Sequence, residues 1–163
     1  MLLYLLRHGD ALESGDDDAS RPLSPLGEEQ AMAAANTLIA LHLYVEIILS
    51  SPLVRAKQTA ECIRTVLRNP PHSVTEYLTP GTHERQLFRQ LSECGRQSAL
   101  LVGHEPHLRE FTSLLISGSR HSRVEVRKGT MLCLETSIPV GSGSGGLKWM
   151  LTSEQMKRLV GIS

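Results

Sequence analysis

Three short stretches of the sequence combine basic side chains with turn-forming residues. The apolar run "YLL" near the start ends in Arg7, His8 and Gly9. Arg55 lies in "SSPLVRAKQT", and His104 lies in "VGHEPHL". A guanidinium group binds the oxygens of a phosphoryl group in a bidentate manner, and a neutral imidazole can attack phosphorus as a nucleophile. These residue types therefore indicate phosphoryl chemistry, provided that the fold brings the three stretches together.

The elements around these stretches alternate between strands and helices. Short apolar or β-branched runs predict strands over residues 2–6, 44–50, 73–78 and 98–103. Helical spacing predicts helices over residues 24–42, 51–68, 83–94 and 106–117. In the first of these helices, we expect Ser24 to be the N-cap and Pro25 to occupy the first turn. Residues 129–138 and 146–151 are expected to form a hairpin, and residues 152–160 a final short helix.

This alternation predicts an α/β fold, a three-layer α/β/α sandwich with a mainly parallel central sheet. The C-terminal antiparallel hairpin is expected at the edge of that sheet. Residues 1–163 show neither an internal repeat nor a long linker, so we expect a single domain. Ligands of such sheets bind outside the carboxyl ends of the strands. The three basic stretches all follow predicted strands, so they should form one positively charged pocket.

Composition excludes several other classes of protein. The 17 basic and 17 acidic residues give a net charge of zero, which argues against a nucleic-acid binder that relies on bulk positive charge. No apolar segment approaches the roughly 20 residues that span a bilayer, and "MLLYLL" lacks the basic start of a signal peptide. The three cysteines, Cys62, Cys94 and Cys133, are widely spaced and odd in number, so we expect reduced thiols and a cytoplasmic location.

The stretches "LLRHGDA", "SSPLVRAKQTA" and "LLVGHEPHL" resemble the three signatures of the histidine phosphatase superfamily, which has the phosphoglycerate mutase-like fold. The short chain more closely resembles the SixA-type phosphohistidine phosphatases, and the resemblance extends over residues 1–150. It implies that His8 is the nucleophile and that Arg7 and Arg55 bind phosphate. It also implies that His104 is the second histidine of the pocket.

These roles make chemical sense. A neutral imidazole attacks best, and the ordinary histidine pKa near 6.5 should be lowered further in His8 by the neighbouring arginines. The reaction would then pass through a phosphohistidine on the enzyme. His104 could donate to a phosphoryl oxygen, and Gly9 would let the backbone approach the phosphate closely. This scheme requires neither a metal ion nor another cofactor.

Other polar residues have weaker candidate roles. Arg21 matches a family position near the pocket and could add a phosphate contact. Lys128 could line the entrance or be a solvated lysine. The run Asp16–Asp18 is either a solvated loop or a group that steers basic or histidine-bearing substrates. His107 follows His104 closely, but the intervening proline and the absence of a third ligand argue against a metal site.

The acid that would protonate a leaving oxygen is not evident, and Glu84 and Asp18 are the candidates. Without such an acid, a phosphohistidine-bearing protein is favoured as substrate, because its imidazole can leave as a neutral ring. A small phosphorylated molecule hydrolysed by the same mechanism is the alternative. A non-catalytic phosphate-binding module is a third possibility, which the intact set of Arg7, His8, Arg55 and His104 argues against.

Overall fold

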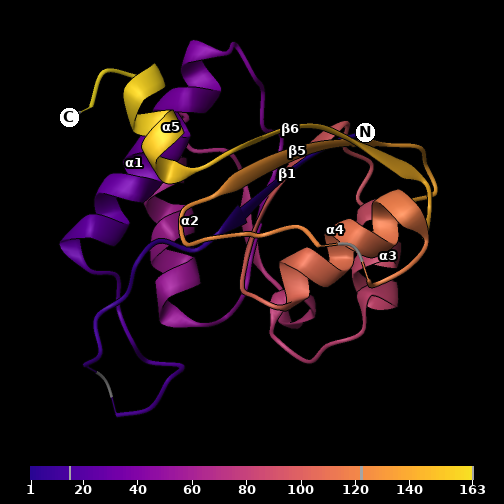
Figure 1. Ribbon diagram of the computed structural model, residues 1–163, viewed down its shortest axis with the longest axis horizontal. Helices are drawn as coiled ribbons and strands as arrows, with labels where there is room; N and C mark the ends of the chain where they lie inside the picture. The colour runs from indigo at the N-terminus through magenta and orange to yellow at the C-terminus, as the bar shows by residue number, and fades with distance from the viewer. Residues whose placement is uncertain (15, 122, 163) are drawn as a thin grey trace.

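The computed structural model describes residues 1–14, 16–121 and 123–162 (Figure 1). In chain order its elements are β1 (Leu2–Arg7), α1 (Pro25–Ala40), β2 (Ile48–Ser50), α2 (Val54–Val66), β3 (His72–Val74), a 3-10 helix (Glu76–Leu78), α3 (Glu84–Glu93), β4 (Ser98–Gly103), α4 (His107–Ser117), β5 (Met131–Thr136), β6 (Gly145–Leu151) and α5 (Ser153–Leu159). The connection between β1 and α1 contains residue 15, which lies outside the described residues.

The strands form one six-stranded sheet in the order β3-β2-β4-β1-β5-β6. The first four strands in this order are parallel, and the β5–β6 hairpin is antiparallel, as predicted. Side chains of a strand alternate between the two faces of its sheet. Leu3 and Leu5 therefore pack against α3 and α4, whereas Tyr4 and Leu6 pack in the cluster formed with α1, α2 and α5. Figure 1 shows these two groups of helices on opposite sides of the strands, which confirms the three-layer α/β/α fold.

The register of the central strands fixes the place where a ligand can bind. Arg7 at the end of β1 faces Gly103 at the end of β4, and Ser50 at the end of β2 faces Val102. Neighbouring strands lie about 4.8 Å apart, so the residues after these three ends share a small region. Among the described residues, no helix is both long and apolar enough to cross a membrane.

Two predicted strands differ from the structure. The strand expected over residues 44–50 is limited to Ile48–Ser50, and the prediction of strand for residues 76–78 is wrong. The Thr75 hydroxyl accepts a hydrogen bond from the Tyr77 amide at 3.3 Å, which begins the 3-10 helix. Side-chain capping of this kind competes with strand pairing, and the turn buries Leu78 completely in the core.

The start of α1 positions the chain that follows β1. Ser24 is the N-cap, as predicted: its hydroxyl accepts from the Gly27 amide at 3.1 Å and donates to an Asp10 carboxylate oxygen at 2.7 Å. A Cβ atom added at Gly27 would lie 2.0 Å from the Asp10 carbonyl oxygen. Only glycine therefore allows the backbone after β1 to lie directly against α1.

We expect Gly27→Ala to destabilise the protein, although alanine normally stabilises a helix by about 1 kcal/mol relative to glycine. The contact with Asp10 should reverse this sign and lower the free energy of unfolding by about 2 kcal/mol or more. Urea denaturation measures the change. Gly141→Ala is the control, because nothing lies within 4 Å of a Cβ at that position. A Gly27→Ala variant more stable than the parent would contradict this account of the packing.

Candidate active site

A pocket of about 240 Å³ opens at the carboxyl ends of β1, β2 and β4. Its basic lining residues are Arg7, His8, Arg21, Arg55, His104 and Lys128. Asp18 and Glu105 contribute two carboxyl groups to the same wall. The structure thus brings together the four residues that the sequence singled out on three separate stretches, because the strands that carry them are neighbours in the sheet.

The His8 ring is held in one tautomer. Its Nδ1 lies 2.6 Å from the Gly9 carbonyl oxygen, which can only accept, so Nδ1 carries the proton. Its Nε2 lies 3.2 Å from the Arg55 Nε–H, which can only donate, so Nε2 presents its lone pair. A ring fixed in this way has a nucleophilic nitrogen beside a guanidinium group.

His104 lies directly beside His8. The ring centroids are 4.8 Å apart, with the ring planes inclined by 52°. Both His104 ring nitrogens are buried, and neither has a hydrogen-bond partner among the residues that the structure describes. A neutral imidazole has one N–H donor and one acceptor, so His104 can donate to an oxygen of a ligand held between the two rings.

Hydrogen bonds to oxygen atoms hold Arg55 and Arg7 in place. Arg55 donates from its other guanidinium nitrogens to the carbonyl and the carboxylate of Asp18, the latter at 3.0 Å. Arg7 donates from Nη1 to the Val126 carbonyl at 2.9 Å. The Asp18 carboxylate is well exposed, so its ion pair with Arg55 contributes little free energy and can be exchanged for a ligand anion.

Burial is the largest influence on both histidines. It lowers the pKa of His8 to about 4, with Arg55 and Arg7 adding to the shift and the Gly9 carbonyl opposing it. The same effect, with further contributions from His8 and Arg55, lowers the pKa of His104 to about 3. Both imidazoles are therefore neutral at pH 7, which is the state that a nucleophile requires.

The remaining candidates for contact with phosphate or substrate are Arg21, Lys128 and residues 16–18. Carboxylates hold the first two, and the side chains of the last three are exposed. Arg21 lines the pocket, but its guanidinium group donates to the Leu12 carbonyl, Asp18 and Glu13. Lys128 also lines the pocket and pairs with Asp10 at 2.7 Å. The side chains of residues 16–18 are exposed, and of these residues Asp18 reaches the pocket.

Position 9 requires glycine for a reason that the sequence did not suggest. It is not part of the pocket lining, and a Cβ atom on it would lie 2.4 Å from the Gly27 carbonyl oxygen. Its amide donates to the Thr59 hydroxyl at 3.2 Å. The close approach at Gly9 is thus to α1, and it fixes the carbonyl that accepts from His8.

The carboxyl groups are distributed differently from the expectation. Glu84 is buried at the start of α3 in an ion pair with Arg120, away from the pocket lining. Glu105 lines the pocket instead, and burial raises the pKa of its carboxyl group. Glu105 is not among the acids that the sequence suggested, although its position directly after His104 was the available signal.

His107 is buried at the start of α4 and does not line the pocket. Within residues 1–14, 16–121 and 123–162, no group of three or more histidine, cysteine, aspartate or glutamate side chains is arranged to hold a metal ion.

Comparison with known proteins gives the family. Residues 3–87 match the model of the histidine phosphatase superfamily, branch 1. An uncharacterized protein of Picosynechococcus is 33% identical over 141 residues, which cover 83% of this chain and 86% of the relative. The phosphohistidine phosphatase SixA of Escherichia coli is 28% identical over 162 residues, which cover 96% of this chain and 97% of that protein.

Solved structures agree with the sequence comparison. A structure of the protein histidine phosphatase SixA complexed with tungstate matches with a TM-score of 0.88 and 25% identity, covering 96% of this chain and 100% of that chain. The chain therefore belongs to the histidine phosphatase superfamily. Within the superfamily it is a homologue of SixA, and this relationship supports phosphatase activity.

The lowered pKa values of the two histidines predict a loss of stability in acid. Their folded-state pKa values lie below the ordinary value, so the unfolded chain binds protons first as the pH falls. The stabilising contribution is complete above about pH 6.5 and is lost toward pH 4 for His8 and pH 3 for His104. Between pH 6.5 and 4, the unfolding free energy of the parent should decrease by about 3 kcal/mol more than that of His104→Gln.

Urea denaturation at several pH values measures this dependence. The control is His83→Gln, since His83 is exposed and its side chain caps no helix. Parallel curves of unfolding free energy against pH for the parent and His104→Gln would show that His104 does not titrate as described.

Proposed function

We propose that this protein hydrolyses phosphohistidine on other proteins through a covalent phosphohistidine at Nε2 of His8, without a metal ion. The observation that carries the proposal is the fixed His8 tautomer. Nδ1–H is held by the Gly9 carbonyl, and the Nε2 lone pair accepts from the Arg55 Nε–H in a pocket that is also lined by Arg7 and His104. The name of the relative SixA, a phosphohistidine phosphatase, supports the same substrate class.

In the first step, the Nε2 lone pair of His8 exchanges its hydrogen bond with Arg55 for a bond to phosphorus, and the bond between phosphorus and the substrate imidazole breaks. The electron pair of that bond stays on the leaving nitrogen. If the distal nitrogen of the substrate ring carries a proton, the ring leaves as neutral imidazole and needs no acid from the enzyme. Arg7, Arg55 and His104 line the pocket where the charge of the transferring group is spread over its three oxygens, and their N–H groups can bind those oxygens.

In the second step, a water oxygen attacks phosphorus and the Nε2–phosphorus bond breaks. The electron pair returns to Nε2, one proton of the water passes to a phosphoryl oxygen while the other stays on the attacking oxygen, and inorganic phosphate leaves. Nδ1 keeps its proton throughout, because the N–H group stays hydrogen-bonded to the Gly9 carbonyl. The His8 ring therefore leaves as a neutral imidazole, in the form in which it began. The two steps are thus chemically alike, since each expels a neutral imidazole.

The two carboxyl groups that the sequence suggested as acids, those of Asp18 and Glu84, agree with this choice of substrate. Hydrogen bonds from Arg55 and Arg21 lower the pKa of Asp18, so this carboxyl group is ionised at neutral pH and is a poor acid. Glu84 lies outside the pocket. Of the three candidates, only Glu105 combines a place in the lining with a raised pKa.

Glu105 is the observation that favours the second candidate function, a small-molecule phosphomonoesterase. An alkyl phosphate must expel a basic alkoxide, which needs a proton from the enzyme. We therefore propose that Glu105 supplies this proton when such a substrate reacts at His8.

The proposal also covers domain and location. We propose that residues 1–163 act as one catalytic domain in the cytoplasm. The single sheet that contains all six strands supports one domain. The free thiols of Cys62, Cys94 and Cys133 support a reducing compartment.

We expect a histidine-phosphorylated peptide to be dephosphorylated in the presence of EDTA, and His8→Ala to reduce kcat by at least about 1,000-fold, since it removes the nucleophile. Quenching the reaction of a 32P-labelled substrate should leave acid-labile, alkali-stable label on the parent protein. The His83→Ala variant is the control and should keep both activity and label. Label on His8→Ala, or loss of turnover in EDTA, would contradict the mechanism.

We expect Glu105→Gln to affect substrates unequally. The kcat/KM for an alkyl phosphate such as glycerol 2-phosphate should fall by roughly 100-fold, because general acid catalysis is lost. The value for phosphohistidine should change by less than about threefold, because its leaving group is neutral. Glu93→Gln, an exposed change on α3, is the control. Equal losses on both substrates would show that Glu105 does not act as the acid.

A further inference from the structure

A second, larger cleft of about 550 Å³ lies next to the phosphate pocket. Its basic lining residues are Arg7, Arg109, Arg120, His121, Arg123 and Arg127, and we call this feature the arginine cleft. The protein as a whole has no net charge, so this concentration of arginine is local. Such a charged cleft focuses the field that an approaching anion meets.

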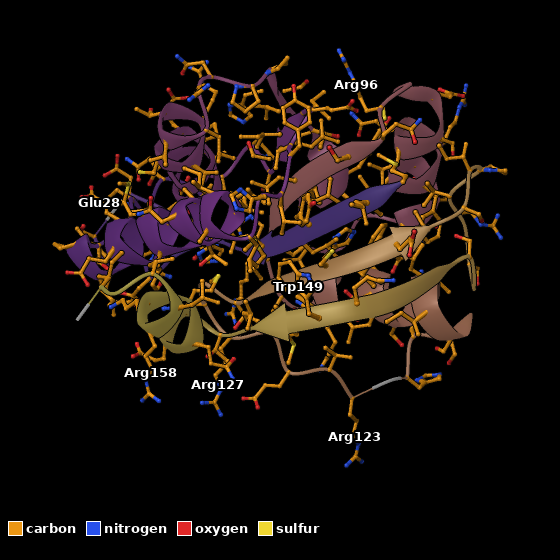
Figure 2. All side chains as sticks on the ribbon, turned by 90° about the horizontal axis from the view of Figure 1, so that it is seen from above. Glu28, Arg96, Arg123, Arg127, Trp149 and Arg158 are labelled. Carbon is orange, nitrogen blue, oxygen red and sulfur yellow. The ribbon has the colours of Figure 1, made fainter. Side chains whose placement is uncertain are left out.

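Arg120 of the arginine cleft is held by the buried Glu84, whereas the ion pairs of Arg127 and Arg109 are weak. Arg127 pairs with Glu125 at 2.8 Å, but both side chains are 73% exposed, and exposed pairs of this kind contribute little free energy. Arg109 is only loosely paired with Glu105, at 4.0 Å. The Arg123 side chain extends outward on the same side of the molecule as Arg127 (Figure 2). These guanidinium groups can therefore exchange their internal partners for carboxylates of another molecule.

The arginine cleft and the phosphate pocket share a wall. Arg7 and Glu105 line both. Arg7 also donates to the carbonyl of Val126, which ties the segment that carries Arg123 and Arg127 to the end of β1. A molecule whose phosphoryl group lies between His8 and His104 would therefore extend past Arg7 into the arginine cleft.

We propose that the arginine cleft binds an acidic segment of the phosphohistidine-bearing protein, next to the phosphorylated residue. This inference rests on the proposed function and adds the kind of partner that the site selects. The carboxylates of the segment would pair with Arg123, Arg127 and Arg109 at the rim. Such rim pairs affect association rate and specificity more than the chemical step.

The shape of the arginine cleft favours a polypeptide over the second phosphate of a small molecule. A compact anion needs donors that converge on one point, whereas Arg123 and Arg127 point outward at separate places along the segment (Figure 2). The cleft has more than twice the volume of the phosphate pocket. Val124 and Val126 give it apolar lining between the arginines, and an apolar centre with a polar rim is typical of protein interfaces.

The test uses two synthetic peptides of equal length that carry one phosphohistidine. One has three glutamates beside it, and the other has glutamines at the same places. Free phosphohistidine is the third substrate. The variant Arg123→Gln/Arg127→Gln is compared with Arg96→Gln/Arg68→Gln, which removes the same charge from exposed sites outside the arginine cleft. Arg96 extends from the opposite side of the molecule in Figure 2.

The parent should cleave the glutamate peptide with a kcat/KM about three- to tenfold above that of the glutamine peptide, and the difference should shrink with added salt. Arg123→Gln/Arg127→Gln should remove this preference and leave the kcat/KM for free phosphohistidine unchanged. The control variant should keep the preference for the glutamate peptide. No preference in the parent, or an equal loss on all three substrates, would overturn the proposal.

A binding measurement separates this proposal from the proposed function. Fluorescence anisotropy with the unphosphorylated, labelled glutamate peptide requires no turnover. Weaker binding by Arg123→Gln/Arg127→Gln than by the parent and the control would support the arginine cleft even if no phosphohistidine were hydrolysed. Equal binding by all three proteins would overturn it, even if phosphohistidine turnover were fast.

Discussion

The hydrogen bond between the His8 ring and the Gly9 carbonyl is the interaction on which the rest of the site depends. It determines which ring nitrogen holds the proton, and so it leaves the other one free to face Arg55. The carbonyl is fixed because Gly9 lies against Gly27 at the start of α1, where neither residue has room for a Cβ atom. The packing of a helix on a strand thus controls the chemical state of a side chain.

The sheet supplies the second constraint. Register places Arg7 opposite Gly103, so the next residue of each strand brings His8 beside His104. The apolar layers on both faces of the sheet keep these strands in place, and both histidines are buried at the ends of the strands. The low pKa of each histidine follows mainly from this burial. The burial that comes with packing of the sheet therefore also keeps both imidazole rings neutral.

Much of this arrangement could be predicted from the sequence, and the exceptions have physical causes. Strands that end in basic residues predicted the convergence, because parallel strands present their carboxyl ends at one edge. Sequence could not show that Glu84 is buried against Arg120, which is distant in the chain. It also missed Glu105 as a pocket residue and mistook the turn at Thr75 for strand, since capping by a hydroxyl group depends on local geometry.

The pairing of β1 with β4 has a consequence for how the protein is made. His8 and His104 are far apart in the sequence, so residues 9 to 103 must follow His8 out of the ribosome before His104 can reach it. β1 also needs β5 as its other neighbour, so both strands that pair with β1 are made long after it. Contacts between such distant segments form late in folding. A nascent chain therefore carries His8 well before it can form the pocket around that residue.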